Sequence, residues 1–155
     1  MRHLFWTLAM CLISVQVLPA QQAPTLGSSR PSLESPSTSR TADPRMLVKI
    51  RKVYIARIDH NLDEKLAHDL AHVSGLKVVN KEDDADAIVR GTCFDLRRLK
   101  RLDAEVYISD RTTGKAIWQD VIHVTSDPKD LSMAVDQAAS EITAHLNESI
   151  RRAAR

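Results

Sequence analysis

Five segments of the chain have apolar residues that alternate with polar ones or form short runs, a pattern typical of β-strands. They are residues 48–58, 76–79, 87–96, 103–109 and 115–124. The last three follow one another closely. A basic loop joins the first two of these three, and the polar turn Asp110–Gly114 joins the last two. Because Gly114 can take a positive φ, this turn suits a hairpin. The pattern therefore predicts a three-stranded meander at the centre of the fold.

Two further segments have apolar residues at helical spacing. In the first, Asn61 is placed to cap a helix, Glu64 completes the capping-box spacing and Gly75 is placed to end the helix. The second begins at Pro128, a residue suited to the first position of a helix, and continues nearly to the C-terminus. The apolar positions are Leu62, Leu66, Leu70 and Val73 in the first helix, and Leu131, Val135, Ala138, Ile142, Leu146 and Ile150 in the second.

The order of these segments indicates the fold class. A strand, a helix and a second strand over residues 48–79 predict a right-handed parallel crossover. A meander also needs helices to cover one of its faces. We therefore predict an α+β fold with a single mixed five-stranded sheet, the order β-α-β-β-β-α, and two helices on one face. The domain is expected over residues 46–155, and about 110 residues suffice for one modest core.

The first twenty residues have the anatomy of a secretory signal peptide. Met1–His3 is a short basic segment, residues 4–18 are apolar but too few to span a bilayer, and Ala20 is a small residue suited to cleavage. We expect cleavage after Ala20 or after Ala23, which would make the protein periplasmic or secreted.

Two other interpretations of this segment are less consistent with its residues. An uncleaved membrane anchor is disfavoured because Gln16 interrupts the apolar run and no stop-transfer charges follow directly. A lipid-bearing Cys11 is disfavoured because Met10 stands where a small residue is expected and the preceding apolar run is too short.

Residues 21–45 are predicted to be a disordered linker. They contain four prolines among serines and threonines, with only Leu26 and Leu33 as sizeable apolar groups. Such a segment cannot bury enough surface to offset the entropy of ordering it. A solvated spacer is the simpler interpretation, and a tether through the cell wall is the alternative.

Charge and composition restrict the partners. The 22 basic and 20 acidic side chains nearly balance, which gives no support for nucleic-acid binding. Aromatic residues make up 4% of the chain, so stacking platforms for bases or sugars are not expected. The expected partner is an envelope protein or an anionic envelope component, with membrane contact at most peripheral. No glycine-rich phosphate loop occurs, and we predict no cofactor.

The string His68–His72 resembles the zinc-protease motif H-E-x-x-H-x-x-G-x-x-H. It departs from that motif because Asp69 replaces the glutamate and Val78 stands where the third histidine belongs. On a helical wheel both histidines lie on the solvent side, whereas a catalytic zinc needs three protein ligands in a cleft. We therefore reject the protease and predict no metal site, leaving a surface metal site at this pair as the remaining alternative.

Cys93 is the one cysteine that remains after signal removal. It alternates within a predicted strand and is expected to be buried in the core, since free cysteines are among the most buried residues. An intermolecular disulfide is the alternative. A catalytic Cys–His pair would need His123 or His145 nearby, and the spacing does not favour that.

The basic loop and one face of the sheet are the candidate partner-binding surfaces. The candidate residues are Arg97, Arg98, Lys100, Arg101 and Tyr107. A charged hairpin tip can also be solvated and protect a sheet edge. The residues expected on the sheet face away from the helices are Lys49, Arg51, Arg90, Glu105, Tyr107 and Gln119, which would make that face polar and open.

Two motifs carry a family resemblance. The first is the strand Ala-Asp-Ala-Ile-Val-Arg-Gly at residues 85–91, and the second is the hairpin formed by residues 106–110 and 113–118, which ends in Trp118. Several exported bacterial domains have the same arrangement. Over about residues 48–150 the chain resembles the curli-secretion-channel periplasmic type, the amino-terminal domain of the Tol translocation protein and outer-membrane activators of peptidoglycan synthases.

This resemblance implies a non-enzymatic envelope domain that binds protein partners. The channel-forming insertions and the lipid-bearing cysteine of several members are absent from this sequence, which argues against pore formation and membrane anchoring. No functional residue transfers. We therefore expect an exported protein-interaction or adaptor module without enzymatic activity. The alternative is a small metal-dependent or thiol hydrolase that uses His68 and His72 or Cys93.

Overall fold

The computed structural model describes residues 39–127 and 129–155. The predicted signal peptide with both cleavage sites, Cys11, most of the predicted linker and the predicted helix start at Pro128 lie outside the described residues. No helix within the described part of the chain is long and apolar enough to cross a membrane.

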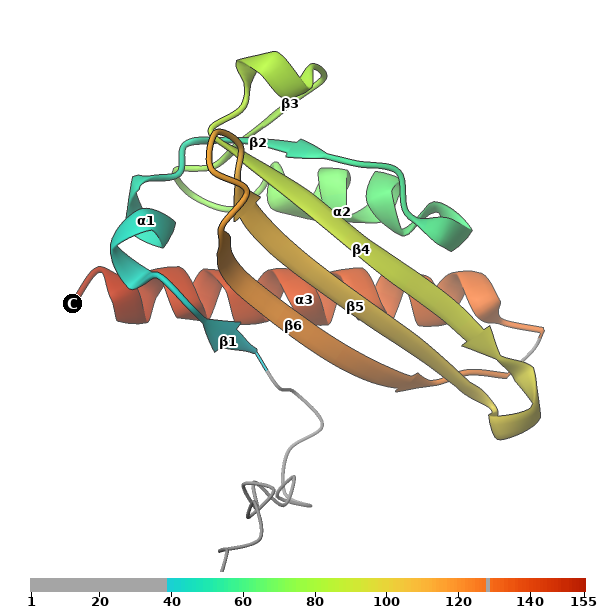
Figure 1. The fold of residues 1–155 in the computed structure, drawn as a ribbon. Helices are drawn as coiled ribbons and strands as arrows, with labels where there is room; N and C mark the ends of the chain where they lie inside the picture. Colours follow the sequence, from blue (N-terminus) through green and yellow to red (C-terminus); the bar gives the residue numbers. More distant parts are fainter. Residues whose placement is uncertain (1–38, 128) are drawn as a thin grey trace, which may run out of the picture. The chain divides into compact units, whose positions relative to one another are not determined.

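The described residues form one open sheet of six strands with three α-helices (Figure 1). The strands are β1 (Arg40–Thr41), β2 (Lys52–Ile55), β3 (Lys77–Val79), β4 (Ala87–Leu96), β5 (Arg101–Asp110) and β6 (Ala116–Thr125). The helices are α1 (Pro44–Lys49), α2 (Leu62–Leu70) and α3 (Leu131–Ala153). The sheet order is β1-β6-β5-β4-β2-β3. Strands β4, β5 and β6 are the predicted antiparallel meander, while β2 runs parallel to both β3 and β4.

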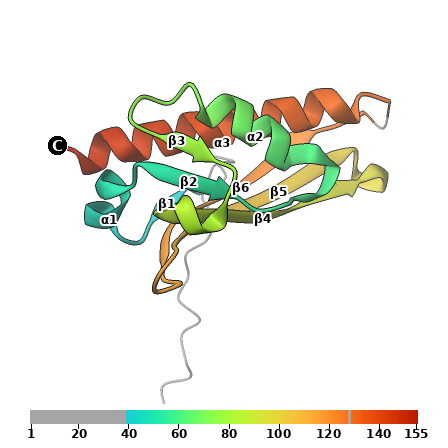
Figure 2. The same cartoon turned by 90° about the horizontal axis from the view of Figure 1, so that it is seen from above.

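Both α2 and α3 lie on one side of the sheet (Figure 2), and their apolar faces enclose the core between helices and strands. Trp118 of β6 is 1% exposed in this core and donates from Nε1 to Ser149 Oγ of α3 at 3.0 Å. The predicted α+β class, the mixed sheet and the pair of helices on one face are confirmed.

The predicted count of five strands is one too few, and the predicted order of elements, with four strands and two helices, omits two strands and one helix. The observed order is β-α-β-α-β-β-β-β-α. The additional strand is β1, which pairs through Arg40 and Thr41 with Gln119 and Trp118 of β6. β1 lies inside the segment predicted to be linker. It was not predicted because strand pairing through backbone groups leaves little trace in a segment that is poor in apolar residues.

The segment predicted as one strand over residues 48–58 is divided between α1 and β2. Pro44 stands in the first turn of α1, and the Asp43 side chain accepts a hydrogen bond from Met46 N at 3.0 Å. This cap starts a short helix that continues through the first two residues of the predicted strand. The folded domain therefore begins before Met46.

The caps of α2 also differ from the prediction. Asn61 occupies the N-cap position, but its φ is 60° and its side chain makes no capping hydrogen bond, so the capping box with Glu64 does not form. The helix ends at Leu70, with Ala71 as its C-cap, and Gly75 follows in a separate turn at φ 88°.

The residues of the two quoted motifs have structural roles. Asp86 Oδ2 accepts backbone hydrogen bonds from Arg51 at 3.0 Å and Lys52 at 2.9 Å, which ties the start of β2 to the segment before β4. Asp110 Oδ1 accepts from Thr113 N at 2.6 Å and Thr113 Oγ1 at 2.7 Å in the β5–β6 turn. These hydrogen bonds lower the pKa of Asp110.

Candidate functional site

The face of the meander that lies away from α2 and α3 carries ordered rows of side chains. In one row, Arg90 is paired with Tyr107, and Tyr107 with Gln119. Glu105 lies on the same face, two residues before Tyr107 on β5. The structure therefore places these four residues on the face where the sequence predicts them. It does not place Lys49 there, because that residue ends α1, nor Arg51, which precedes β2.

Two large apolar side chains are exposed on this open face. Phe94 is 55% exposed and Tyr107 is 38% exposed. Phe94 was not identified from the sequence as a partner-binding candidate, although the alternation of buried and exposed positions along its strand was a signal. Cys93 is buried at 1% exposure toward the helices, so the next residue along β4 must point to the opposite face.

Between the two aromatic residues and the hairpin tip lies a small polar network. Asp103 is paired with Phe94 on one side and with His123 on the other. Its Oδ2 accepts from Arg101 Nη2 at 2.8 Å, and its Oδ1 lies 2.8 Å from His123 Nδ1. The network pairs Arg101 with Asp103 along β5, while the Arg101 side chain remains 42% exposed.

The predicted basic loop forms the tip of the β4–β5 hairpin. Arg97 Nε contacts Asp95 Oδ2 at 2.7 Å, which pairs a second predicted cation internally. Arg98 and Lys100 have no ion pair within the described residues. Leu99 between them is 65% exposed. The tip thus presents three exposed cations, of which only Arg97 is ion-paired among the residues described, and one apolar side chain.

Tyr107 does not join the basic tip. It lies six residues beyond Arg101 along β5, or about 20 Å at the usual rise of an extended strand. Asp103 and Glu105 occupy the same face between them. The five predicted partner-binding residues therefore divide into a tip group and a central aromatic residue that lies near Arg90.

Cys93 lies in the core and is not part of a catalytic pair. Burial raises the pKa of its thiol to about 11, with a smaller contribution from Asp59. His123 is on the opposite face of the sheet, and His145 is bound to a carboxylate. The expectation of a buried core thiol agrees with this placement.

A buried carboxylate–histidine pair links β6 to α3. Asp120 is 0% exposed, its Oδ2 lies 2.7 Å from His145 Nδ1, and its Oδ1 accepts from Val121 N at 3.0 Å. Burial raises the pKa of Asp120 and outweighs the opposing effect of the hydrogen bond with His145. The sequence analysis missed this pair, although an acidic residue at the inward position between Trp118 and Ile122 was a signal.

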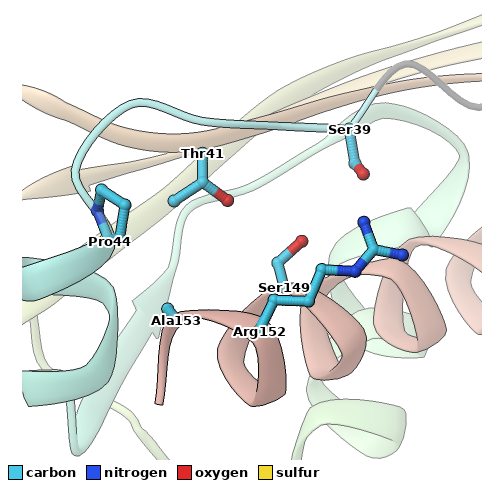
Figure 3. Close-up of a pocket in the computed structure, with 6 residues that line it drawn as sticks. All are labelled: Ser39, Thr41, Pro44, Ser149, Arg152 and Ala153. Atoms are coloured by element: carbon cyan, nitrogen blue, oxygen red, sulfur yellow. The ribbon is translucent and has the colours of Figure 1, made fainter. Parts of the chain in front are cut away.

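A hollow of about 320 Å³ lies between the segment that enters β1 and the C-terminal end of α3 (Figure 3). Its wall contains Thr41 and Ser149 with the stem of Arg152. The Arg152 guanidinium donates to Glu148 at 2.9 Å, and Ser149 Oγ accepts from Trp118. Two polar groups of the wall, Ser149 Oγ and the Arg152 guanidinium, are therefore already engaged in internal contacts.

His68 is exposed in the last turn of α2, on the solvent side where the helical wheel places it, and His72 is exposed in the turn that follows the helix. Within residues 39–127 and 129–155, no group of three or more histidine, cysteine or acidic side chains could hold a metal ion. The pair therefore has no third protein ligand among these residues.

The comparisons show a fold shared with bacterial proteins at low sequence identity. No protein-family model matches the chain, and no curated protein matches it significantly. The PelC dodecamer from Paraburkholderia phytofirmans aligns with a TM-score of 0.52 and 14% identity over 72% of this chain and 97% of that chain. TolB from Acinetobacter baumannii aligns with a TM-score of 0.51 and 10% identity over 74% of this chain and 30% of that chain.

A PDZ domain protein from Parabacteroides distasonis aligns with a TM-score of 0.53 and 13% identity over 71% of this chain and 34% of that chain. The chain thus covers about a third of TolB and of the PDZ domain protein, and nearly all of PelC. The likeness to TolB agrees with the predicted resemblance to a Tol protein at the level of the fold. The chain shares its α+β fold with PelC and TolB.

Proposed function

We propose that this protein is an exported, non-enzymatic module of the bacterial envelope that docks a protein partner on its open sheet face. The observation that carries the proposal is the exposure of Phe94 and Tyr107 on a face that neither α2 nor α3 covers. Exposed aromatic residues are enriched in protein interfaces because they bury a large area and carry a polar edge. Arg90 beside Tyr107 adds a third residue type common at interface centres.

The signal-like first twenty residues and the likeness in fold to PelC and TolB support an envelope location. Cleavage after Ala20 or Ala23 would release the domain into the periplasm or the medium. Arg98 and Lys100 at the hairpin tip would favour a partner with an acidic rim, because complementary charge steers association.

The hydrolase alternative has less support. A thiol hydrolase needs an accessible thiolate, but Cys93 is 1% exposed and its pKa is raised to about 11. The histidine pair at the C-terminal end of α2 lacks, among the described residues, the third ligand that a catalytic zinc requires. The geometry therefore favours the binding module.

Crosslinking in the native envelope tests the proposal. A photoreactive amino acid at Gln119, next to Tyr107, should give a discrete crosslinked product with one protein. The double variant Phe94→Ala/Tyr107→Ala should abolish that product. Met133→Ala is the matched control, because Met133 is 69% exposed but belongs to α3. Arg98→Glu should weaken the crosslink without abolishing it.

The outcome also identifies the partner class. PelC is described as a dodecamer, so a second copy of this chain is one candidate partner. A product at twice the chain mass would identify it. If the aromatic double variant crosslinks as well as the control variant, or if no product forms, docking on the open face is excluded.

A further inference from the structure

His68 in the last turn of α2 and His72 in the turn after the helix each make a hydrogen bond through Nδ1 that orients the ring. His72 Nδ1 lies 2.8 Å from the backbone oxygen of His68, and His68 Nδ1 lies 3.1 Å from Asp69 Oδ1. A carbonyl or carboxylate oxygen only accepts, so Nδ1 must donate in both rings. In a neutral imidazole the other nitrogen, Nε2, then carries the lone pair. No hydrogen bond within the described residues engages either Nε2.

The two rings are also spaced as the ligands of one ion would be. His72 lies two residues beyond the end of α2, and the hydrogen bond from its Nδ1 to the backbone oxygen of His68 holds its ring beside that of His68. Here the ring centroids are 5.1 Å apart and the rings are tilted by 51°. A metal–nitrogen bond is about 2.0–2.1 Å long, so two imidazoles bound to one ion have centres roughly 5 Å apart.

The partners of the two Nδ1 atoms match a recurring feature of metal sites. Metal-binding histidines usually donate their second N–H to a carboxylate or a backbone carbonyl, which fixes the tautomer and the ring. His68 has the carboxylate of Asp69 in this position, and His72 has a backbone carbonyl. Both rings are therefore held in the tautomer that a metal requires before any ion binds.

We propose that His68 and His72 form a chelating site for a late first-row divalent ion such as Ni²⁺ or Zn²⁺. Imidazole nitrogen suits these ions, whereas Mg²⁺ prefers oxygen ligands. Because no third protein ligand is present among the described residues, water fills the remaining positions. Asp69 is a positioning residue that orients His68. This is a binding site, distinct from the protease centre that the sequence excludes and independent of the open sheet face.

Calorimetric titration of the full chain, prepared without a histidine tag, tests the proposal. Ni²⁺ should bind with one ion per chain and more tightly than Co²⁺, as the order of divalent ions requires. His68→Ala or His72→Ala should weaken Ni²⁺ binding by about tenfold or more, because the second contact of a chelate is intramolecular. An excess of Mg²⁺ should not compete. Asp69→Asn should weaken binding by a smaller factor.

His123→Ala is the matched control. His123 is exposed and its Nδ1 is bound to a carboxylate, but it has no second histidine beside it. This variant should bind Ni²⁺ as the unmodified chain does. The NMR signals of the His68 and His72 ring protons should shift on addition of Zn²⁺, while those of His123 should not. Equal Ni²⁺ affinity in all variants, or no binding at about 1 mM ion, would overturn the proposal.

Discussion

At the scale of single residues, Gly91 shows how a family-like motif can be structural. A Cβ atom built on Gly91 would lie 2.4 Å from the backbone oxygen of Glu105 and 3.1 Å from a methyl group of Val106. The approach of β5 to β4 thus depends on the missing side chain. The motif residue Asp86 likewise binds two backbone amides. The residues that carry the resemblance therefore maintain the sheet and say little about a partner.

Gly91→Ala should destabilise the protein by roughly 1–3 kcal/mol, because strand β5 must shift to admit the methyl group. The control is Gly114→Ala, which has open space around it and a φ of 69°. This control should cost roughly 1 kcal/mol through backbone strain alone. Urea unfolding measures both values. A smaller loss for Gly91→Ala than for Gly114→Ala would show that the close approach is not maintained.

The thiol of Cys93 should be unreactive in the folded protein. It is 1% exposed and its pKa is raised to about 11 by burial, so little thiolate is present at neutral pH. In a Cys11→Ser variant, a disulfide reagent should label Cys93 slowly in buffer and rapidly in denaturing urea. Rapid stoichiometric labelling of the folded variant would contradict this placement.

At the scale of elements, the contact between β6 and α3 includes an ionisable pair in addition to the Trp118–Ser149 hydrogen bond. Asp120 of β6 is fully buried and its carboxylate meets His145 of α3. Nearby Glu141 adds a repulsive charge that also raises the pKa of Asp120. Because the folded protein holds the Asp120 proton more tightly than the unfolded chain, this group stabilises the fold most at low pH.

The stability that Asp120 contributes should be complete below its ordinary pKa of 3.8 and should be lost as pH rises through its higher folded pKa. Asp120→Asn removes this titration. The free energy of unfolding of the unmodified protein minus that of Asp120→Asn should therefore fall as pH rises above 3.8. Urea unfolding of both proteins over a pH series measures it. A difference that grows with pH would mean that the folded pKa is lowered.

The elements were predicted well where a periodic apolar pattern defines them. The meander and both long helices were found because their alternation or helical stripe continues over many residues. The start of α1 and the strand β1 were missed for a physical reason. Both depend on backbone partners, namely the Asp43 cap and the pairing of Arg40 and Thr41 with β6, which the local sequence does not encode.

At the scale of the whole molecule, only those features of the candidate site that follow from the local sequence pattern could be predicted. The open face follows from alternation, so Arg90, Glu105, Tyr107 and Gln119 could be placed together. The ion pairs of Arg97 with Asp95 and of Arg101 with Asp103 join residues two apart in sequence, so they were missed although the local sequence held a signal for them. The Asp120–His145 pair joins residues 25 apart in sequence, and only the fold brings them together.

The observed domain start gives a stability prediction for the whole fold. A chain that begins at Ser39 keeps β1 and the Asp43 cap, whereas a chain that begins at Met46 lacks both. We expect the shorter chain to be less stable by about 1–2 kcal/mol, the usual value of a helix cap with some additional pairing. Thermal and urea unfolding of the two chains measure the difference. Equal stability would place the functional start of the domain at Met46.

The position of β2 between two parallel neighbours has a kinetic consequence. The hairpins of β4, β5 and β6 close over short loops, so their contacts can form early at small entropic cost. Strand β2 must instead be inserted between β3 and β4, beyond a helix and two connections. We therefore expect the link from Asp86 to the amides of Arg51 and Lys52 to form after the rate-limiting step. Loss of this carboxylate would accelerate unfolding and leave the refolding rate nearly unchanged.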